Sequence, residues 1–302
     1  MRGLQLADKQ LQFFGGSWTE QKLHMLEEYL KAYVKVLKNQ RFQCVYIDAF
    51  AGTGYREMNS PSLEEGFFAK ELTESEPQEF FDGSARIALR TKPSFSKYIF
   101  IERSSKRFEE LLKLKTEFVS LADRIVFDKN DCNSVLQDLC RGWDSFRMRG
   151  VLFLDPFGMQ VEWSTLEAVA RTQAIDVWIL FPLGVSVNRM LPKDGQVPDA
   201  WRERLCRTFG ASDWYERFYR SSTVQGFFDT ETRLVKIGSF NAIADYYLER
   251  LRSIFAGVAE NPRVLLNSRN NPLFLLCFAV GNPSLKAKET ALKIAQHILA
   301  KG

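Results

Sequence analysis

The sequence has few of the residues that build metal sites and histidine-based active sites. It contains five scattered cysteines with no CxxC pair, and two histidines, His24 and His297, near opposite ends of the chain. An odd, scattered set of cysteines encodes neither a disulfide framework nor a zinc or iron–sulfur cage. Two remote imidazoles also argue against a Ser-His-Asp hydrolase or a histidine-ligated metal enzyme. We therefore expect no metal site.

Long apolar runs, repeats and low-complexity tracts are also missing. No stretch approaches about 18 consecutive apolar residues, and residues 1–16 lack the apolar core and cleavage site of a signal peptide. This pattern predicts a cytoplasmic protein without a membrane segment. The absence of repeats favours a single domain over residues 1–302, interrupted by insertions.

Charge is close to balanced, with 41 Lys and Arg against 37 Asp and Glu and a formal net charge of +4. A slightly basic chain suits a polyanionic partner, but this excess is far below the dense basic patches that mark nucleic-acid binding. Nucleic acid therefore stays an open but weakly supported partner.

Short apolar runs of strand character alternate with segments of helical spacing along the chain. This alternation predicts βαβ units and an α/β, doubly wound, Rossmann-like parallel sheet with helices on both faces. A helix at about 17–38, with Ser17 and Glu20 as a capping box, is expected before the first strand. The predicted parallel strands are VYIDAF at 45–50, KYIFIE at 97–102, RIVFD at 124–128, VLFLD at 151–155 and DVWILF at 176–181.

The end of the chain departs from this alternation. A helix at about 240–257 is followed by RVLLNS and PLFLLCFAV, which are separated by a short polar turn. So tight a connection predicts an antiparallel strand pair. A parallel sheet that ends in such a pair is the arrangement of class I S-adenosylmethionine (SAM)-dependent methyltransferases. A final helix should pack on the sheet through Ala291, Leu292, Ala295, Ile298 and Leu299.

The loop AFAGTG after the first predicted strand is a candidate cofactor site. Gly52 and Gly54 allow a sharp turn and let a ligand approach the backbone closely. Asp48 ends the strand and Phe50 lies within the loop, so both are candidate cofactor contacts with the two glycines. The alternative is that the glycines only serve a strand-to-helix turn.

Acidic residues follow the next two strands. Glu102 ends KYIFIE, where an acid in nucleotide-binding folds accepts hydrogen bonds from ribose hydroxyls. Asp131 follows RIVFD and can accept the exocyclic amine of an adenine ring. For Asp131 alone, a solvated loop acid is an equally good interpretation.

The fourth strand ends in LDPFGMQVEW, at the edge where a methyl acceptor should lie. Asp155, Pro156 and Phe157 are the candidate catalytic residues, through a carboxylate, a carbonyl and an aromatic ring. Amino-directed nucleic-acid methyltransferases carry DPPY, whereas here glycine occupies the aromatic position. We therefore expect Phe157 to point into the sheet and the acceptor to be another amine or a hydroxyl, with duplex DNA not methylated.

Two segments are predicted insertions. Residues 55–82 are acidic and predict a lid, a partner surface or a plain loop. Residues 190–236 place aromatic side chains among arginines, which can clamp an unpaired nucleotide. The favoured alternative is that WRERLCRTFG and WYERFYR are amphipathic helices with core-facing aromatics and solvated arginines.

Together these motifs resemble the three-Cys-motif partner protein (TcmP) family, which is similar to class I methyltransferases. The resemblance implies SAM as cofactor and a partner protein bearing a three-cysteine motif, radical-SAM-like in type. It leaves open a non-catalytic partner subunit or a nucleic-acid-binding accessory protein. The motifs are WTEQKLHMLEEYLKAY at 18–33, YIDAFAGTG at 46–54, FDGSARIAL at 81–89, YIFIER at 98–103, LFLDPFGMQVEW at 152–163, FPLGVSVNR at 181–189 and PLFLLCFAVGNPSLKAKETA at 272–291.

Overall fold

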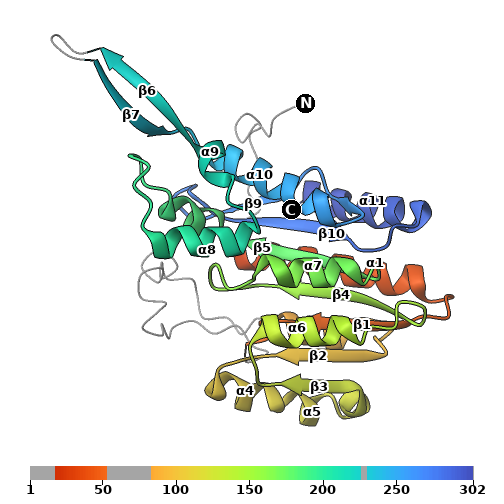
Figure 1. Ribbon diagram of the computed structural model, residues 1–302. Helices are drawn as coiled ribbons and strands as arrows, with labels where there is room; N and C mark the ends of the chain where they lie inside the picture. Colours follow the sequence, from red (N-terminus) through yellow and green to blue (C-terminus); the bar gives the residue numbers. More distant parts are fainter. Residues whose placement is uncertain (1–17, 53–82, 226–229, 302) are drawn as a thin grey trace.

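The computed structural model describes residues 18–52, 83–225 and 230–301 (Figure 1). The predicted insertion at 55–82, Gly54, and Ser17 of the predicted capping box lie outside these residues.

The centre of the molecule is an eight-stranded sheet in the order β3-β2-β1-β4-β5-β10-β8, with β9 also paired to β10. Strands β1 to β5 are parallel, whereas β10 runs antiparallel to β5, β8 and β9. The predicted antiparallel end of the sheet is thereby confirmed, and β8 is a short addition that sequence patterns did not predict. The strands are β1 (Gln43–Asp48), β2 (Lys97–Ile101), β3 (Ile125–Asp128), β4 (Met148–Leu154), β5 (Ile175–Phe181), β8 (Gly257–Val258), β9 (Arg263–Leu266) and β10 (Pro272–Val280).

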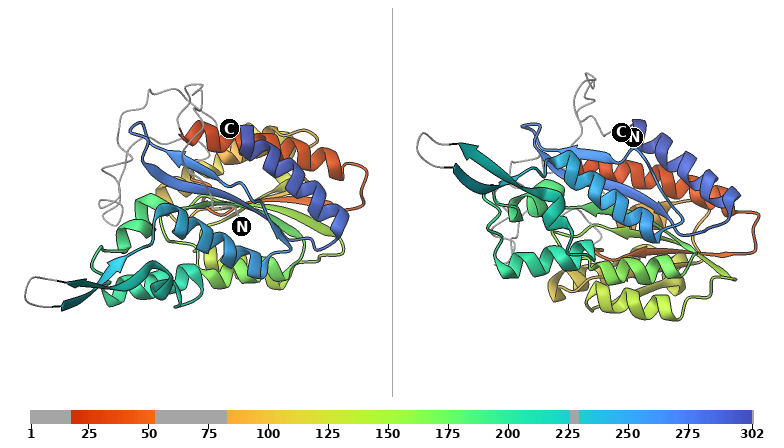
Figure 2. Two further views of the ribbon diagram at one scale, coloured as in Figure 1. Left: turned by 90° about the horizontal axis from the view of Figure 1, so that it is seen from above. Right: turned by 45° about the horizontal axis from the view of Figure 1, so that its top comes forward.

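Helices cover both faces of the sheet, as predicted (Figures 1 and 2). The first face packs against α6 (Cys132–Arg141), α7 (Trp163–Arg171), α8 (Asp199–Phe209) and α10 (Phe240–Ile254). The second face packs against α1 (Trp18–Leu37), α3 (Ser84–Arg90), α4 (Ser105–Leu112), α5 (Leu114–Glu117) and α11 (Leu285–Lys301). None of these described helices has the length and apolar character needed to cross a membrane.

Alternation along the strands divides their side chains between two hydrophobic cores, one on each face of the sheet. Ile47, Ile99 and Ile179 lie in the first core, whereas their neighbours Tyr46, Tyr98 and Trp178 lie in the second. Successive strand residues point to opposite faces, and both faces are covered, so every position can be apolar. Each strand therefore contributes to both cores, and both cores combine aliphatic side chains with aromatic rings.

The N-terminal helix α1 is joined to the sheet by polar contacts as well as by packing. Tyr29 Oη donates to Asp176 Oδ2 at 2.9 Å, and Gly281 N donates to Asp176 Oδ1 at 3.2 Å. Burial raises the pKa of Asp176 to about 6 despite these two donors. One buried carboxyl group therefore links α1, β5 and the end of β10.

The region 190–236 differs in part from the sequence prediction. Trp214 and Phe218 of α9 (Trp214–Phe218) are buried, which confirms aromatics that face the core. The predicted helix WYERFYR is wrong at its end, because Tyr219 begins β6 (Tyr219–Gln225). This strand pairs with β7 (Thr230–Lys236) in a separate two-stranded sheet that projects from the body (Figure 2).

Two other segments also depart from simple helices. The segment of helical spacing after β2 is divided into α4, α5 and the 3₁₀ helix η1 (Val119–Arg124). After β5, the chain forms the short π-helical turn η2 (Leu183–Val187) and the 3₁₀ turn η3 (Asn188–Met190).

Gly184 lies so close to Pro272 of β10 that a Cβ would meet its carbonyl oxygen at 1.8 Å. Only glycine therefore fits at this contact.

Candidate functional site

A cleft of about 650 Å³ lies at the carboxyl ends of β1, β2, β3 and β4. This edge is where doubly wound sheets bind ligands, and the volume falls within the roughly 300–1,000 Å³ range of small-molecule sites. The cleft is lined by Ala49, Phe50, Gly52, Glu102, Arg103, Ser104, Lys106, Arg107, Asn130, Asp131, Cys132, Asn133, Phe157, Met159, Gln160, Val161, Glu162, Arg204, Arg207 and Thr208.

The loop after β1 is fixed by hydrogen bonds to both neighbouring strands. Ala49 N donates to Phe153 O at 3.1 Å, and Ala51 N donates to Ile101 O at 3.0 Å. Gly52 adopts φ +60°, a conformation that disfavours side chains, and a Cβ on it would meet no described atom within 4 Å. The loop therefore presents bare backbone to the cleft.

Asp48 supports this loop from below. It is fully buried, and its carboxylate accepts from Tyr46 Oη at 3.2 Å and Phe50 N at 3.3 Å. Burial raises the pKa of Asp48 to about 6, and the charge of Asp155 acts in the same direction. Asp48 does not itself line the cleft, so the structure places it as a brace beneath Phe50.

Glu102 connects the ends of β1 and β2. Its Oε2 accepts from Gly52 N at 3.1 Å, and its Oε1 accepts from Ser104 N at 2.7 Å. Arg107 Nε lies 3.3 Å from Oε2 in an ion pair. The carboxylate is 5% exposed as a residue yet lines the cleft, so it both holds the glycine loop and faces the cavity.

Asp131 begins α6 and also lines the cleft. Its Oδ2 accepts from Asn133 N at 3.0 Å and Ser134 N at 3.2 Å, which is an N-cap. Asn133 in turn joins α6 to the loop after β4, because its Nδ2 donates to Gln160 O and its Oδ1 accepts from Glu162 N. The cap fixes Asp131 at the cleft wall.

Asp155 and Pro156 lie outside the cleft lining. Lys22 Nζ of α1 contacts Asp155 Oδ2 at 2.5 Å, with side-chain exposures of 6% and 24%. Pro156 is buried. The candidate acceptor carboxylate is thus paired with a lysine from the N-terminal helix, a contact between residues 133 positions apart.

Phe157 does not point into the sheet, so that prediction is wrong. The side chain is 51% exposed and lines the cleft, with the Arg107 guanidinium 5.6 Å from its ring centroid. The turn explains this orientation, because Phe157 N donates to Gln160 Oε1 at 3.1 Å and its two neighbours are both buried. Burying the residues on either side turns Phe157 outward.

Of the predicted site residues, five line one cleft. They are Phe50, Gly52, Glu102, Asp131 and Phe157. Asp48, Asp155 and Pro156 lie behind or beside it, and Gly54 lies outside the described residues.

Sequence reasoning missed the basic residues at the start of α4. Arg103, Lys106 and Arg107 line the cleft at positions i, i+3 and i+4. Arg103 precedes the N-cap Ser104, whereas Lys106 and Arg107 lie in the first turn of α4, so the chain brings all three next to Glu102. The basic residues of the stretch ERSSKR follow directly after Glu102, so the sequence contained this signal.

The strand order, the antiparallel β10 and the glycine loop at the carboxyl edge together define a Rossmann-like fold of the class I methyltransferase type. No protein-family model matches the chain, and no curated protein matches it in sequence.

Solved structures with a similar chain path include a protein from Legionella pneumophila, with 13% identity, a TM-score of 0.47 and 95% of each chain covered. Spermidine synthase in complex with the transition-state analogue AdoDATO has 12% identity and a TM-score of 0.40, over 89% of this chain and 63% of that chain. Magnesium protoporphyrin IX methyltransferase from Synechocystis with bound SAM has 11% identity and a TM-score of 0.31, over 76% and 85%. Because these TM-scores are below 0.5, the fold assignment rests on the strand order and directions of this chain.

Proposed function

We propose that this protein is a SAM-dependent methyltransferase whose cofactor occupies the cleft at the carboxyl ends of β1 to β4. The observation that carries the proposal is the convergence of a bare glycine turn and two carboxylates, from three different strand ends, on one cavity. Bound SAM would supply an activated methyl group on its sulfonium.

The cleft residues match the parts of such a cofactor. Glu102 would accept hydrogen bonds from ribose hydroxyls, and Asp131, whose described hydrogen bonds both end on Oδ2, would accept the adenine amine through Oδ1. The backbone at Phe50 and Gly52 would border the methionine portion. The open space at the Gly52 Cβ position is the feature that a close-lying ligand requires.

The protein's part in methyl transfer is mainly positioning. An activated methyl group needs an aligned acceptor more than a strong base, so the scarcity of histidine is no obstacle. Asp155 and the carbonyl of Pro156 would hold an amine or hydroxyl of the acceptor, with Phe157 beside it. Lys22 holds the Asp155 carboxylate in place.

By its resemblance to three-Cys-motif partner proteins, we propose that the protein works with a radical-SAM-like protein bearing a three-cysteine motif. A second candidate is a non-catalytic partner subunit with the same fold. It is favoured by the internal bonds of the key acids, since Glu102 is held by Gly52 and Ser104, and Asp155 by Lys22.

Calorimetry with SAM tests the proposal. We expect the wild type to bind, and Gly52→Asn to lose binding while it stays folded, because asparagine tolerates positive φ but fills the cavity. Gly52→Val should lose binding too, at a further cost in stability because a β-branched residue is strained at φ +60°. Circular dichroism checks the fold. Wild-type protein that binds no SAM at millimolar ligand would leave the non-catalytic candidate, and unchanged affinity in Gly52→Asn would place the cofactor elsewhere.

A further inference from the structure

Two helices place basic side chains on the lining of the cleft. Arg103 precedes α4, and Lys106 lies in its first turn. Arg204 and Arg207 lie on α8 at positions i and i+3, which places them on one face of that helix. All four side chains are exposed. The cleft is therefore bordered by four cations from two separate elements.

None of these four cations forms an ion pair with another described residue, although Glu102, Asp131 and Glu162 line the same cleft. Arg107 pairs with Glu102, whereas no ion pair or hydrogen bond between described residues involves the side chains of Arg103, Lys106, Arg204 or Arg207. Some other exposed cations of this protein are paired, such as Lys113 with Glu110. With Arg107 included, the lining carries five basic side chains against three acidic ones, Glu102, Asp131 and Glu162, and this excess creates a positive potential over the cleft.

The proposed cofactor does not account for this potential. SAM carries a sulfonium, an ammonium and a carboxylate, so its net charge is positive and a cationic border disfavours it. The potential instead suits an anionic second ligand. Since the inference rests on the proposed function, that ligand is the methyl acceptor.

An exposed aromatic ring lies on the same cleft. Phe157 is 51% exposed and is the residue that follows Asp155 and Pro156. An exposed ring bordered by cations forms a stacking platform for an unpaired base, which contributes roughly 1–3 kcal/mol per base. A cleft of about 650 Å³ is too small for a paired duplex, so a base that reaches it beside the cofactor must be unpaired.

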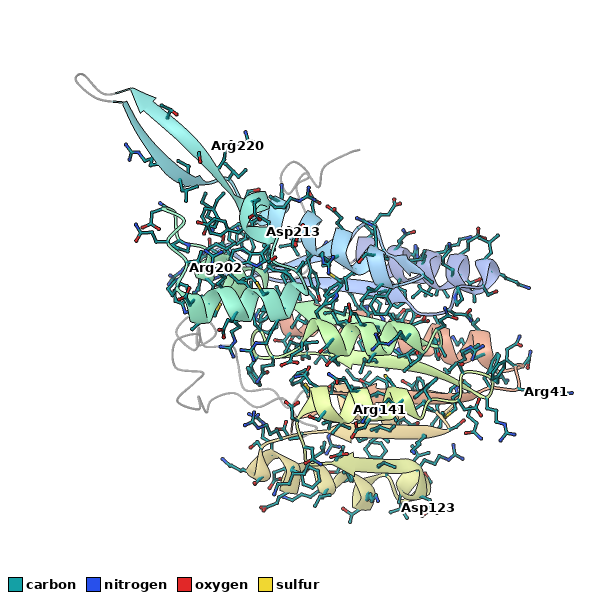
Figure 3. All side chains as sticks on the ribbon, in the orientation of Figure 1. Arg41, Asp123, Arg141, Arg202, Asp213 and Arg220 are labelled. Atoms are coloured by element: carbon teal, nitrogen blue, oxygen red, sulfur yellow. The ribbon has the colours of Figure 1, made fainter. Side chains whose placement is uncertain are left out.

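We propose that the methyl acceptor is a single-stranded nucleic acid, with phosphates bound by Arg103 and Lys106 at the start of α4 and by Arg204 and Arg207 on α8. An unpaired base would stack on Phe157, which follows Asp155 and Pro156 in the chain. From the sequence alone, the arginines of residues 190–236 suggested a nucleotide clamp. Three of these arginines have two different roles in the structure. Arg202 (labelled in Figure 3) lies over Tyr215, 4.4 Å from the ring centroid, and is structural, whereas Arg204 and Arg207 line the cleft.

The test is fluorescence anisotropy with labelled 15-nucleotide single-stranded RNA, single-stranded DNA and a DNA duplex, at 50–200 mM salt, with and without SAM. We expect both single strands to bind and the duplex to bind at least roughly tenfold more weakly. The slope of log K against log salt should be about −3, for four phosphate contacts at about −0.7 each.

Three variants separate the parts of the proposal. Arg204→Glu with Arg207→Glu should weaken single-strand binding about 100-fold and flatten the salt slope. Phe157→Ala should weaken binding about tenfold and leave the slope unchanged. The matched control is Lys38→Glu with Arg41→Glu, which changes the net charge equally at the opposite end of the sheet (Figure 3), and its affinity should stay within about threefold. Thermal melting confirms that each variant is folded.

The outcomes distinguish this inference from the proposed activity. Equal losses in the cleft and control pairs, or displacement of the oligonucleotide by polyglutamate of equal charge, would overturn the acceptor site. SAM binding without oligonucleotide binding would leave the methyltransferase proposal and reject a nucleic-acid acceptor. Oligonucleotide binding that depends on Arg204 and Arg207 without any SAM binding would support the nucleic-acid site and reject the activity.

Discussion

Replacing Glu102 tests whether this carboxylate is a cofactor ligand as well as a brace for the glycine loop. Its two oxygens accept from Gly52 N and Ser104 N, at 3.1 and 2.7 Å, and its side chain is 6% exposed. Glu102→Ala removes both bonds. A hydrogen bond to a charged group contributes about 1.5–3 kcal/mol, and water in the cleft replaces part of that loss. We therefore expect the free energy of unfolding to fall by about 2 kcal/mol.

The same variant should also weaken SAM binding, because the ribose hydroxyls lose their acceptor. We expect a loss of about 1–3 kcal/mol, or about 5- to 150-fold in Kd. Glu102→Gln keeps one acceptor oxygen but turns an amide NH₂ toward one of the two backbone N–H groups. It should therefore lie between the wild type and Glu102→Ala in both measurements.

Urea unfolding and SAM calorimetry measure the two effects separately. Tyr29→Phe is the matched control, because it removes the hydrogen bond to Asp176 and so lowers stability at a site that does not line the cleft. We expect Tyr29→Phe to bind SAM normally. If Glu102→Ala loses stability but keeps wild-type SAM affinity, the carboxylate is only a brace and the cofactor assignment is wrong.

Two further predictions concern the half-buried Asp155 and the buried Asp176. Asp155→Ala should abolish methyl transfer, measured with labelled SAM, but leave SAM affinity unchanged. It should also cost about 2 kcal/mol of stability, less than the 3–5 of a fully buried pair because Asp155 is 24% exposed. Retained transfer would refute its role at the acceptor. Asp176 is favoured as the protonated acid in the fold, so its contribution to stability is greatest below about pH 4 and is lost as pH rises through about 6. Asp176→Asn should therefore become more stable relative to the wild type as pH rises through this window. The gain is at most about 3 kcal/mol, at 1.36 kcal/mol per pKa unit. Urea unfolding at several pH values measures it, and a difference that does not depend on pH would contradict this prediction.

The parallel strands and the two helical layers could be predicted from sequence because each is buried on both faces. Runs such as VLFL and DVWILF have no stable alternative to a covered strand, and the strand ends then fix where Gly52, Glu102 and Asp131 meet. The hairpin β6–β7 could not be predicted in this way. Its sequences YRSSTVQ and TETRLVK are polar on both faces, so neither face gives an apolar period.

Side-chain orientation at the site was harder to predict than strand position. The contact between Lys22 and Asp155 joins residues far apart in sequence, and no local pattern in the chain contains it. Phe157 follows a buried strand, so its apolar character favoured an inward position. A backbone-to-Gln160 hydrogen bond in the turn decided otherwise.

The position of β10 affects how the chain can fold during synthesis. This strand comes near the end of the sequence, yet it lies between β5 and β8 and completes the sheet next to Trp178. Until about residue 280 has left the ribosome, β5, apolar except for Asp176, offers an unpaired edge to any other extended chain. Sheet closure therefore depends on a late pairing across nearly 100 residues of intervening sequence, which slows folding and exposes the unfinished chain to aggregation. Shortening the C-terminus would leave that edge permanently open.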